Sequence, residues 1–364
     1  MPIPIIVGLG VAAAAAYGAK KGYDGYQKKS ESDDIVESAK SKYNINYREF
    51  QSQEKKTLAA MNSLGGLELD IGKDFQKFSI LANSLLESLN KERQKKLDIS
   101  FPKHKLQKID AYTYSAISAL GSIAGAGAAG AAAGFAVYGG VMTFAAASTG
   151  TAISSLAGAA ATNATLAAIG GGSLAAGGLG IAGGTAILGA AVAAPILAIV
   201  GWAYDSHAEA ALQNAHEAKR QSEQAVAKLF RATTSLRATE KTVDQLHAAL
   251  TEIRGHFMRY LDVLVDIDNV IASNKRLGGN IDITTSFEDK IIQSVENGYA
   301  LASILTDIIS TPLFKIKQKD GAPVVDAEGV PQMETNEDGG MIINDKQMED
   351  AIEDGMNAVI NLQA

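Results

Sequence analysis

The sequence has no cysteine and only one tryptophan, and aromatic residues make up 6% of its 364 residues. The absence of cysteine excludes disulfide bonds and thiolate zinc sites. A net charge of −7 at pH 7 disfavours general nucleic-acid binding, because that function needs a basic surface. We therefore expect no nucleic-acid partner.

Charge is missing altogether from one long run, which extends from residue 111 to residue 204. Between Asp110 and Asp205 there is no Asp, Glu, Lys, Arg or His, and 19 of the 36 glycines fall there. The run is several times longer than the roughly 20 residues that a membrane-spanning helix needs. We expect it to insert into a bilayer, permanently or conditionally. The alternatives are a soluble Ala/Gly-packed hairpin shielded by its flanks, and low-complexity disorder.

Three sets of residues are candidates for this membrane interaction. Large apolar and aromatic side chains near the ends of the run are candidates for insertion: Ile117, Leu120, Phe135, Phe144, Ile187, Leu188, Val192, Ile196, Leu197, Trp202 and Tyr204. Glycines at a spacing of four would let helices pack closely: Gly121, Gly125, Gly130, Gly134, Gly180 and Gly184. Lysines before the run would contact anionic headgroups, or are ordinary solvated helix-end residues: Lys95, Lys96, Lys103, Lys105 and Lys108.

Long amphipathic helices are predicted on both sides of the run. From Ala208 to Ile271 small and apolar residues recur at alternating steps of three and four, which is a heptad pattern. Such a helix would be on the order of 100 Å long and must lie against another long helix. Residues 33–96 repeat the pattern with irregularities at Glu54 and Glu68, and we expect a kink or break at 65–66, where two glycines occur.

The carboxyl-terminal part contains clear start and stop signals. A capping box at 285–288 predicts a helix that runs to about Ser310, where Pro312 stops it. The following tail has two Asp-Gly pairs, typical of a loose hairpin or a disordered segment, and a short final helix is expected from about Asp345.

The amino terminus is apolar from Pro2 to Ala19 and is followed by Lys20 and Lys21. A secretory signal has its positive charge before the apolar stretch, so cleavable export is not expected. Two interpretations stay open: a segment at the short end of what spans a bilayer, and a small Gly/Ala helix packed against the uncharged run.

Catalytic patterns are weak throughout the chain. The segments GAGAAG at 125–130 and GLGIAG at 178–183 match the dinucleotide-binding pattern, but neither has the strand or the acidic residue that this mechanism needs. GGSLA at 171–175 lacks the last glycine of a nucleophile elbow. The five histidines show no spacing typical of a zinc helix. We expect no enzymatic activity, cofactor, metal or small-molecule substrate.

The layout of long helices around a hydrophobic hairpin resembles the alpha-helical pore-forming toxins and, more loosely, apolipoprotein L. Two segments resemble, in their amino-acid sequence, a family of uncharacterised bacterial proteins: MPIPIIVGLGVAAAAAYGAKKGYD and YGGVMTFAAASTGTAISSLAGAAATNATLAAIGGGSLAAGGLGIAGGTAILGA. This second resemblance covers about a fifth of the chain. It implies a bacterial origin, and no established activity comes with it.

Together these patterns predict an all-α protein, an elongated helical bundle or coiled coil with a long Gly/Ala-rich hydrophobic helical hairpin at one tip. Its expected parts are an apolar segment at 1–30, coiled-coil helices at 31–110, the membrane-active hairpin at 111–204, a heptad helix and a third helix at 205–310, and a turn-rich tail with a short helix at 311–364.

The function expected from this layout is to permeabilise or remodel a lipid bilayer through 111–204, as a pore-forming effector in bacterial conflict or phage defence would. The alternative is a non-lytic coiled-coil scaffold or adaptor anchored to the inner membrane. The expected partners are the bilayer and either further copies of this chain or another helical protein. The expected location is the bacterial inner membrane, or the cytoplasm with conditional membrane association.

Overall fold

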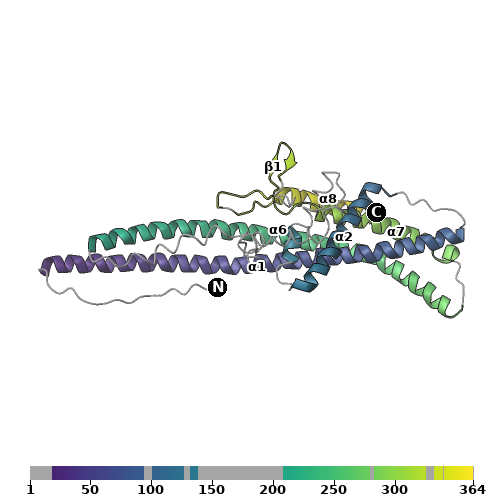
Figure 1. The fold of residues 1–364 in the computed structure, drawn as a ribbon, viewed down its shortest axis with the longest axis horizontal. Helices are drawn as coiled ribbons and strands as arrows, with labels where there is room; N and C mark the ends of the chain where they lie inside the picture. Colours follow the sequence, from purple (N-terminus) through teal and green to yellow (C-terminus); the bar gives the residue numbers. More distant parts are fainter. Residues whose placement is uncertain are drawn as a thin grey trace. The chain divides into compact units, whose positions relative to one another are not determined.

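The computed structural model describes residues 19–93, 101–126, 132–137, 208–278, 283–324, 332–338 and 340–363. About 87% of these residues are helical, which confirms the all-α class (Figure 1). The elements are α1 (Ala19–Arg93), α2 (Lys103–Ala126), α6 (Ala208–Arg276), α7 (Ile283–Ile309), β1 (Gln318–Lys319), β2 (Ala322–Pro323) and α8 (Asp345–Gln363). A further short helical stretch covers 132–137.

The chain divides into two compact units. Unit 1 contains Met1–Arg48 and Ala193–Leu229, and unit 2 contains Glu49–Val192 and Phe230–Ala364. In unit 1, the seam between α1 and α6 uses small side chains, and the Ser222 hydroxyl donates a hydrogen bond of 2.9 Å to the carbonyl oxygen of Ala39. Buried alanines such as Ala215 and Ala225 leave room for this close approach.

Helix α1 is continuous over 75 residues, so of the kink or break predicted at Gly65 and Gly66 the break is wrong and the kink stays a prediction. Glycine weakens a helix by roughly 1 kcal/mol relative to alanine, but packing along the whole helix outweighs that cost. Gly65 is buried against another segment, and Gly66 has no neighbour within 4 Å of the place where a Cβ would stand. One glycine of the pair is therefore explained by close packing, and the other is not.

In unit 2 the two long helices run in the same direction. Arg237 of α6 donates to Glu49 of α1, and Arg254 Nε, further along α6, donates at 2.7 Å to Asp74 Oδ2, further along α1. Residue numbers therefore rise together along the two helices. The sequence pattern did not give this direction, and most of the hairpin expected at one tip lies outside the described residues.

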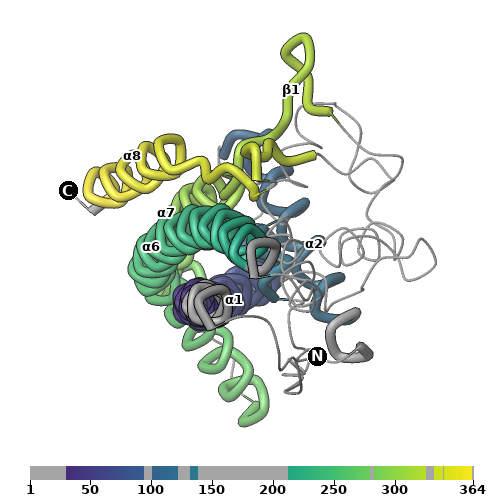
Figure 2. The backbone as a smooth tube through the Cα atoms, turned by 90° about the vertical axis from the view of Figure 1, so that its left-hand side faces the viewer, coloured from purple at the N-terminus to yellow at the C-terminus, as the bar shows by residue number. Residues whose placement is uncertain are grey.

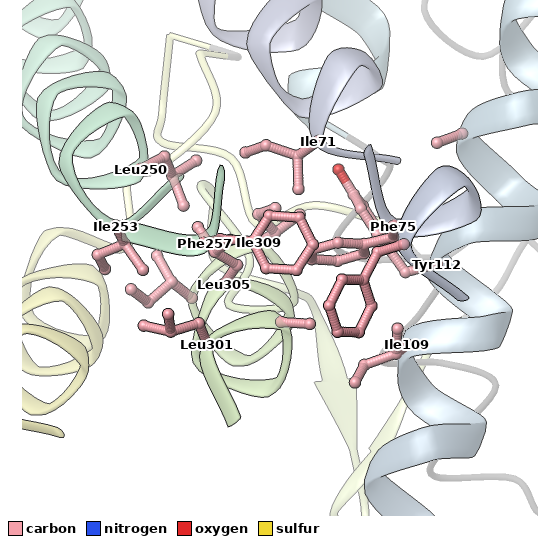
Figure 3. Close-up of a cluster of buried hydrophobic side chains, with 14 of the residues drawn as sticks. Ile71, Phe75, Ile109, Tyr112, Leu250, Ile253, Phe257, Leu301, Leu305 and Ile309 are labelled. Atoms are coloured by element: carbon pink, nitrogen blue, oxygen red, sulfur yellow. The ribbon is translucent and has the colours of Figure 1, made fainter. Parts of the chain in front are cut away.

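The core of unit 2 is built from α1, α2, α6 and α7. Figure 3 shows side chains from all four helices meeting in one cluster. Aromatic rings form its centre, with the Phe75 and Phe257 ring centroids 5.3 Å apart and those of Phe78 and Phe257 5.1 Å apart. Leu250 and Ile253 are fully buried, so the predicted heptad seam of α6 is confirmed at these positions.

Helix α7 packs against both α2 and α8. Its bounds lie within two residues of those predicted from the capping box and Pro312, and α8 begins at Asp345 as predicted. Glycine allows both helices close neighbours: a Cβ on Gly298 would stand 2.2 Å from the ring of Phe78, and one on Gly355 would stand 2.5 Å from Ile308 Cδ1.

The described part of the tail after α7 contains a small β hairpin, one of the two structures predicted for the tail, and residues 325–331 lie outside the described residues. Strands β1 and β2 pair antiparallel across Asp320 and Gly321, whose φ angles of 54° and 79° are those of a tight hairpin turn (Figure 2). Asp338, the first residue of the second Asp-Gly pair, lies in another turn, in which Asn336 Oδ1 accepts hydrogen bonds of 3.0 Å from the main-chain N–H groups of Asp338 and Gly340.

Candidate functional site

The candidate site lies where the uncharged run begins and packs against the middle of α1. The contacts come from the middle of α2, at Tyr112 and Ala116, and from the short helix at 132–137. On α1 they are received by Gly65, Glu68 and Gly72, whose spacings of three and four residues place them on one helix face. We call this surface of α1 the docking face.

The two glycines of the docking face allow very close contact. A Cβ at Gly72 would stand 2.3 Å from the Cβ of Ala116 in α2. A Cβ at Gly65 would stand 1.7 Å from the carbonyl oxygen of Ala132. Real side chains do not fit at such distances, so the beginning of the run approaches α1 in a way that only glycine permits at these two positions.

Polar groups and rings add specific contacts to this packing. Asn62 Oδ1 accepts a 3.1 Å hydrogen bond from the main-chain N–H of Ala133, which satisfies one of the free amides at the start of the short helix. The Tyr112 hydroxyl donates a 2.6 Å hydrogen bond to the carbonyl oxygen of Glu68. The ring of Tyr112 also lies 6.2 Å from that of Phe135, so α2 and the short helix contact each other as well.

An ionisable residue, Glu68, lies at the centre of the docking face, between Gly65 and Gly72. Its side chain is 2% exposed, and Oε2 has no hydrogen-bond partner. Burial raises the pKa of this carboxyl well above its ordinary value of about 4.5. No basic side chain in the described part of the chain forms an ion pair with it. The carboxyl is therefore favoured in its neutral form while it is covered.

The residues predicted to insert into a membrane divide into two groups. Ile117 and Leu120 are partly buried on α2, and Phe135 is buried in the core of unit 2 with 6% of its surface exposed. The remaining candidates lie outside the described residues: Phe144, Ile187, Leu188, Val192, Ile196, Leu197, Trp202 and Tyr204. Within the residues that the structure describes, none of the helices combines the length and apolar character that crossing a bilayer requires.

The glycines predicted for helix packing are placed differently from the docking glycines. Gly121 is exposed with no neighbour within 4 Å of its Cβ position, Gly134 is buried, and Gly125 lies within α2. Gly130, Gly180 and Gly184 lie outside the described residues. Gly65 and Gly72 were not predicted as packing residues. They are seven residues apart, and this spacing places two residues on the same face of a helix, so it could have indicated a shared contact surface.

The predicted headgroup lysines also differ from one another. Lys103 is exposed and Lys105 is partly buried, whereas Lys108 Nζ lies 2.6 Å from Asp307 Oδ1 of α7. Lys95 and Lys96 lie outside the described residues. Lys108 thus contributes a contact within the protein, and Lys103 presents its charge to the surroundings.

No family model, curated protein or solved structure matches this chain. Residues 19–93, 101–126, 132–137, 208–278, 283–324, 332–338 and 340–363 contain no group of three side chains placed to hold a metal ion. The resemblance to pore-forming toxins and to a bacterial family stays a prediction, and the function has to be argued from the docking face and the uncharged run.

Proposed function

We propose that this protein acts on a lipid bilayer and that residues 111–204 are the part that enters it. The observation that carries this proposal is that the beginning of a run without charge is docked on α1 through glycine and alanine contacts. Contacts between small residues hold helices together in water and in hydrocarbon alike. The same segment is therefore suited to both environments.

The energetics of leaving the docking face favour this exchange. Burial of Phe135 and Val137 in the protein stabilises the docked state by about 1.5–3 kcal/mol per side chain relative to water. A bilayer interior is equally apolar, so most of this stabilisation is recovered when the segment moves from protein into lipid. An Asp or Arg in the run would instead cost about 2.5–3.5 kcal/mol at the centre of a membrane helix. The absence of charge from the run removes that cost.

The proposed action is to permeabilise or remodel the bilayer. The middle of the run, 148–165, is rich in Ser and Thr, and a polar stripe on inserted helices favours a pore over a uniformly apolar anchor. The order of helices and uncharged run in the sequence, which resembles that of the alpha-helical pore-forming toxins, is a further argument for permeabilisation. Binding to vesicles without leakage would instead favour the alternative of a membrane-anchored scaffold.

The test uses the purified full chain with vesicles of phosphatidylcholine and phosphatidylglycerol that contain a self-quenched dye. We expect the wild-type protein to float with the vesicles and release the dye. Val192→Asp should lose both properties while its circular-dichroism spectrum stays unchanged. Gln76→Asp places the same charge on an exposed position of α1 and is the matched control, which should behave as wild type.

Two outcomes would contradict the proposal. The first is a wild-type protein that neither binds the vesicles nor releases the dye over a range of pH and lipid charge. The second is a Val192→Asp variant that unfolds in solution while its folded fraction still binds vesicles as wild type does. In that case the run is a soluble core.

A further inference from the structure

We propose that Glu68 is a protonation-controlled latch, which keeps the beginning of the uncharged run docked on α1 while its carboxyl is neutral and releases the run when the carboxyl ionises. The inference deepens the proposed function, because it names what controls exposure of the run. The docking itself is independent of lipid and can be measured without it.

The geometry places Glu68 directly under the docked segment. Gly65, three residues before it, contacts Ala132, and Gly72, four residues after it, contacts Ala116. Between these two contacts the Tyr112 hydroxyl reaches the carbonyl oxygen of Glu68 itself. The side chain that these contacts surround is 2% exposed. The carboxyl is therefore almost completely shielded from water while the segment is docked.

An ionised carboxylate in this position would lack the partners that a buried charge needs. Oε2 has no hydrogen-bond partner. The cover cannot supply a counter-charge by sequence, because the run contains no basic residue anywhere between Asp110 and Asp205. The free energy of ionising Glu68 is therefore higher in the docked state than in the released state. This difference couples proton binding to docking.

The run, and not α1, is the element that we expect to move. Helix α1 is itself held in the core of unit 2 by Leu64 and Ile71, both fully buried, and by Phe75, whose ring contacts Phe257 of α6 as well as Tyr112 of α2. The docked segment buries three large side chains, Tyr112 on α2 and Phe135 and Val137 in the short helix, and its other buried residues are alanine and glycine. Withdrawing α1 would also expose Phe78, Leu85 and Leu89, which are buried further along the same helix, so we expect the docked segment to move instead.

None of the other ionisable groups described near this part of α1 forms an ion pair with Glu68, because each is not basic or has another partner. Helix α2 contributes the phenol of Tyr112, and the short helix contributes none. Helix α6 presents His247, whose Nε2 lies 3.2 Å from Ser63 Oγ, and Arg254, which is paired with Asp74. On α1 itself, Lys73 pairs with Asp70 at the surface. Among the described residues these groups leave Glu68 without an opposing charge.

The direction of the pH effect follows from proton linkage. A carboxyl that binds its proton more tightly when docked stabilises the docked state at low pH and loses that contribution as pH rises. Between the ordinary glutamate pKa of about 4.5 and the raised pKa of the docked state, the ratio of docked to released molecules should fall about tenfold for each pH unit. The latch is thus closed in acid and opens toward alkaline pH.

The experiment uses the natural absence of cysteine, which allows two spin labels to be placed by cysteine substitution in the full chain. Lys77→Cys on α1 and Gly121→Cys on α2 are both exposed, and nothing lies within 4 Å of the Cβ position at Gly121. Distances between the labels are measured by pulsed electron paramagnetic resonance at about pH 5 and about pH 8. Both values lie above the ordinary pKa of a glutamate, and the docked segment is expected to be released as pH rises between them. A Lys77→Cys and Glu252→Cys pair reports on α1 and α6 as a control.

In the wild-type background we expect a narrow distance distribution for Lys77 and Gly121 at the lower pH and a broad, longer one at the higher pH. Glu68→Gln should keep the narrow distribution at both pH values, because a glutamine cannot ionise. Glu87→Gln, an exposed position on α1, is the matched control and should respond as wild type. The Lys77 and Glu252 distance should not change in any background. If Glu68→Gln fails to fold, Glu68→Met provides a second neutral side chain.

An unchanged distance between Lys77 and Gly121 across this pH range in the wild type would overturn the latch. So would a release in Glu68→Gln with the same pH profile as wild type. Vesicle leakage is measured separately on the same samples. A working latch with intact vesicles at every pH would refute the proposed function alone, and leakage that is identical in wild type and Glu68→Gln at both pH values would refute the latch alone.

Discussion

Gly65 of α1 and Ala132 of the short helix are in main-chain contact, so close that a Cβ on Gly65 would stand 1.7 Å from the Ala132 carbonyl oxygen. The neighbouring Gly66 points to a position where nothing lies within 4 Å. Two adjacent glycines in the same helix therefore have different surroundings, and this difference provides a direct test of docking.

We predict that Gly65→Ala displaces the short helix, because the methyl group and the Ala132 carbonyl cannot occupy the same space. The strain should lower the free energy of unfolding by about 1–3 kcal/mol. Gly66→Ala should instead raise it by up to about 1 kcal/mol, since alanine is the better helix former. Urea denaturation measures both, and hydrogen exchange over 132–137 locates the change. Equal effects of the two substitutions would argue against the docking contact.

Leu250 tests the seam between α6 and its neighbours in unit 2. Its side chain is fully buried, so Leu250→Asp places an unpaired charge in the core and should cost several kcal/mol of the free energy of unfolding. Glu252→Ala is the control, because Glu252 is exposed. Glu240, a polar position on the same helix, is less suitable as a control, because its carboxyl accepts a hydrogen bond from Gln53 of α1. Thermal unfolding measures the stability of both variants. Similarly small losses of stability in Leu250→Asp and Glu252→Ala would contradict a packed seam.

Glu68→Gln should change how stability depends on pH. In the wild-type protein the folded state holds a proton that the unfolded state releases above about pH 4.5, so the Glu68 contribution to stability decreases as pH rises toward its raised pKa. The variant lacks this contribution. Its free energy of unfolding relative to wild type should increase with pH by up to about 1.4 kcal/mol per pH unit. Urea denaturation at a series of pH values measures this difference, and parallel curves for the two proteins would show that Glu68 is not buried as described.

Lysines before the run should differ in their effect on vesicle binding. Lys103 is exposed, so Lys103→Gln should weaken binding to anionic vesicles by about 1 kcal/mol, which is roughly fivefold in the partition coefficient. Lys108 is engaged with Asp307, and Lys108→Gln should change binding less. Vesicle sedimentation at low and high salt measures both. A larger effect at Lys108 than at Lys103 would mean that the ion pair with Asp307 opens at the membrane.

Most of the helices could be predicted from the sequence. Periodicity marked the buried face of α6, and the signals at 285–288 and Pro312 marked the ends of α7 to within two residues. These predictions succeed because capping, helix stops and apolar spacing depend on residues a few positions apart. The hairpin at Asp320 and Gly321 follows for the same reason, since two residues with positive φ are enough to reverse the chain.

How these helices pack together depends on contacts between residues that are far apart along the chain. A heptad pattern shows that one helix face is buried, but it is the same for a parallel and an antiparallel partner, so the common direction of α1 and α6 in unit 2 was not available from it. Gly65 has the same intrinsic helix-weakening effect in any sequence, and whether it breaks the helix or admits a neighbour depends on Ala132, which is distant along the chain. Glu68 interrupts the apolar pattern of α1 and is still buried, because the residues that cover it, Tyr112 and the beginning of the uncharged run, come from other parts of the chain and reach it only in the folded protein.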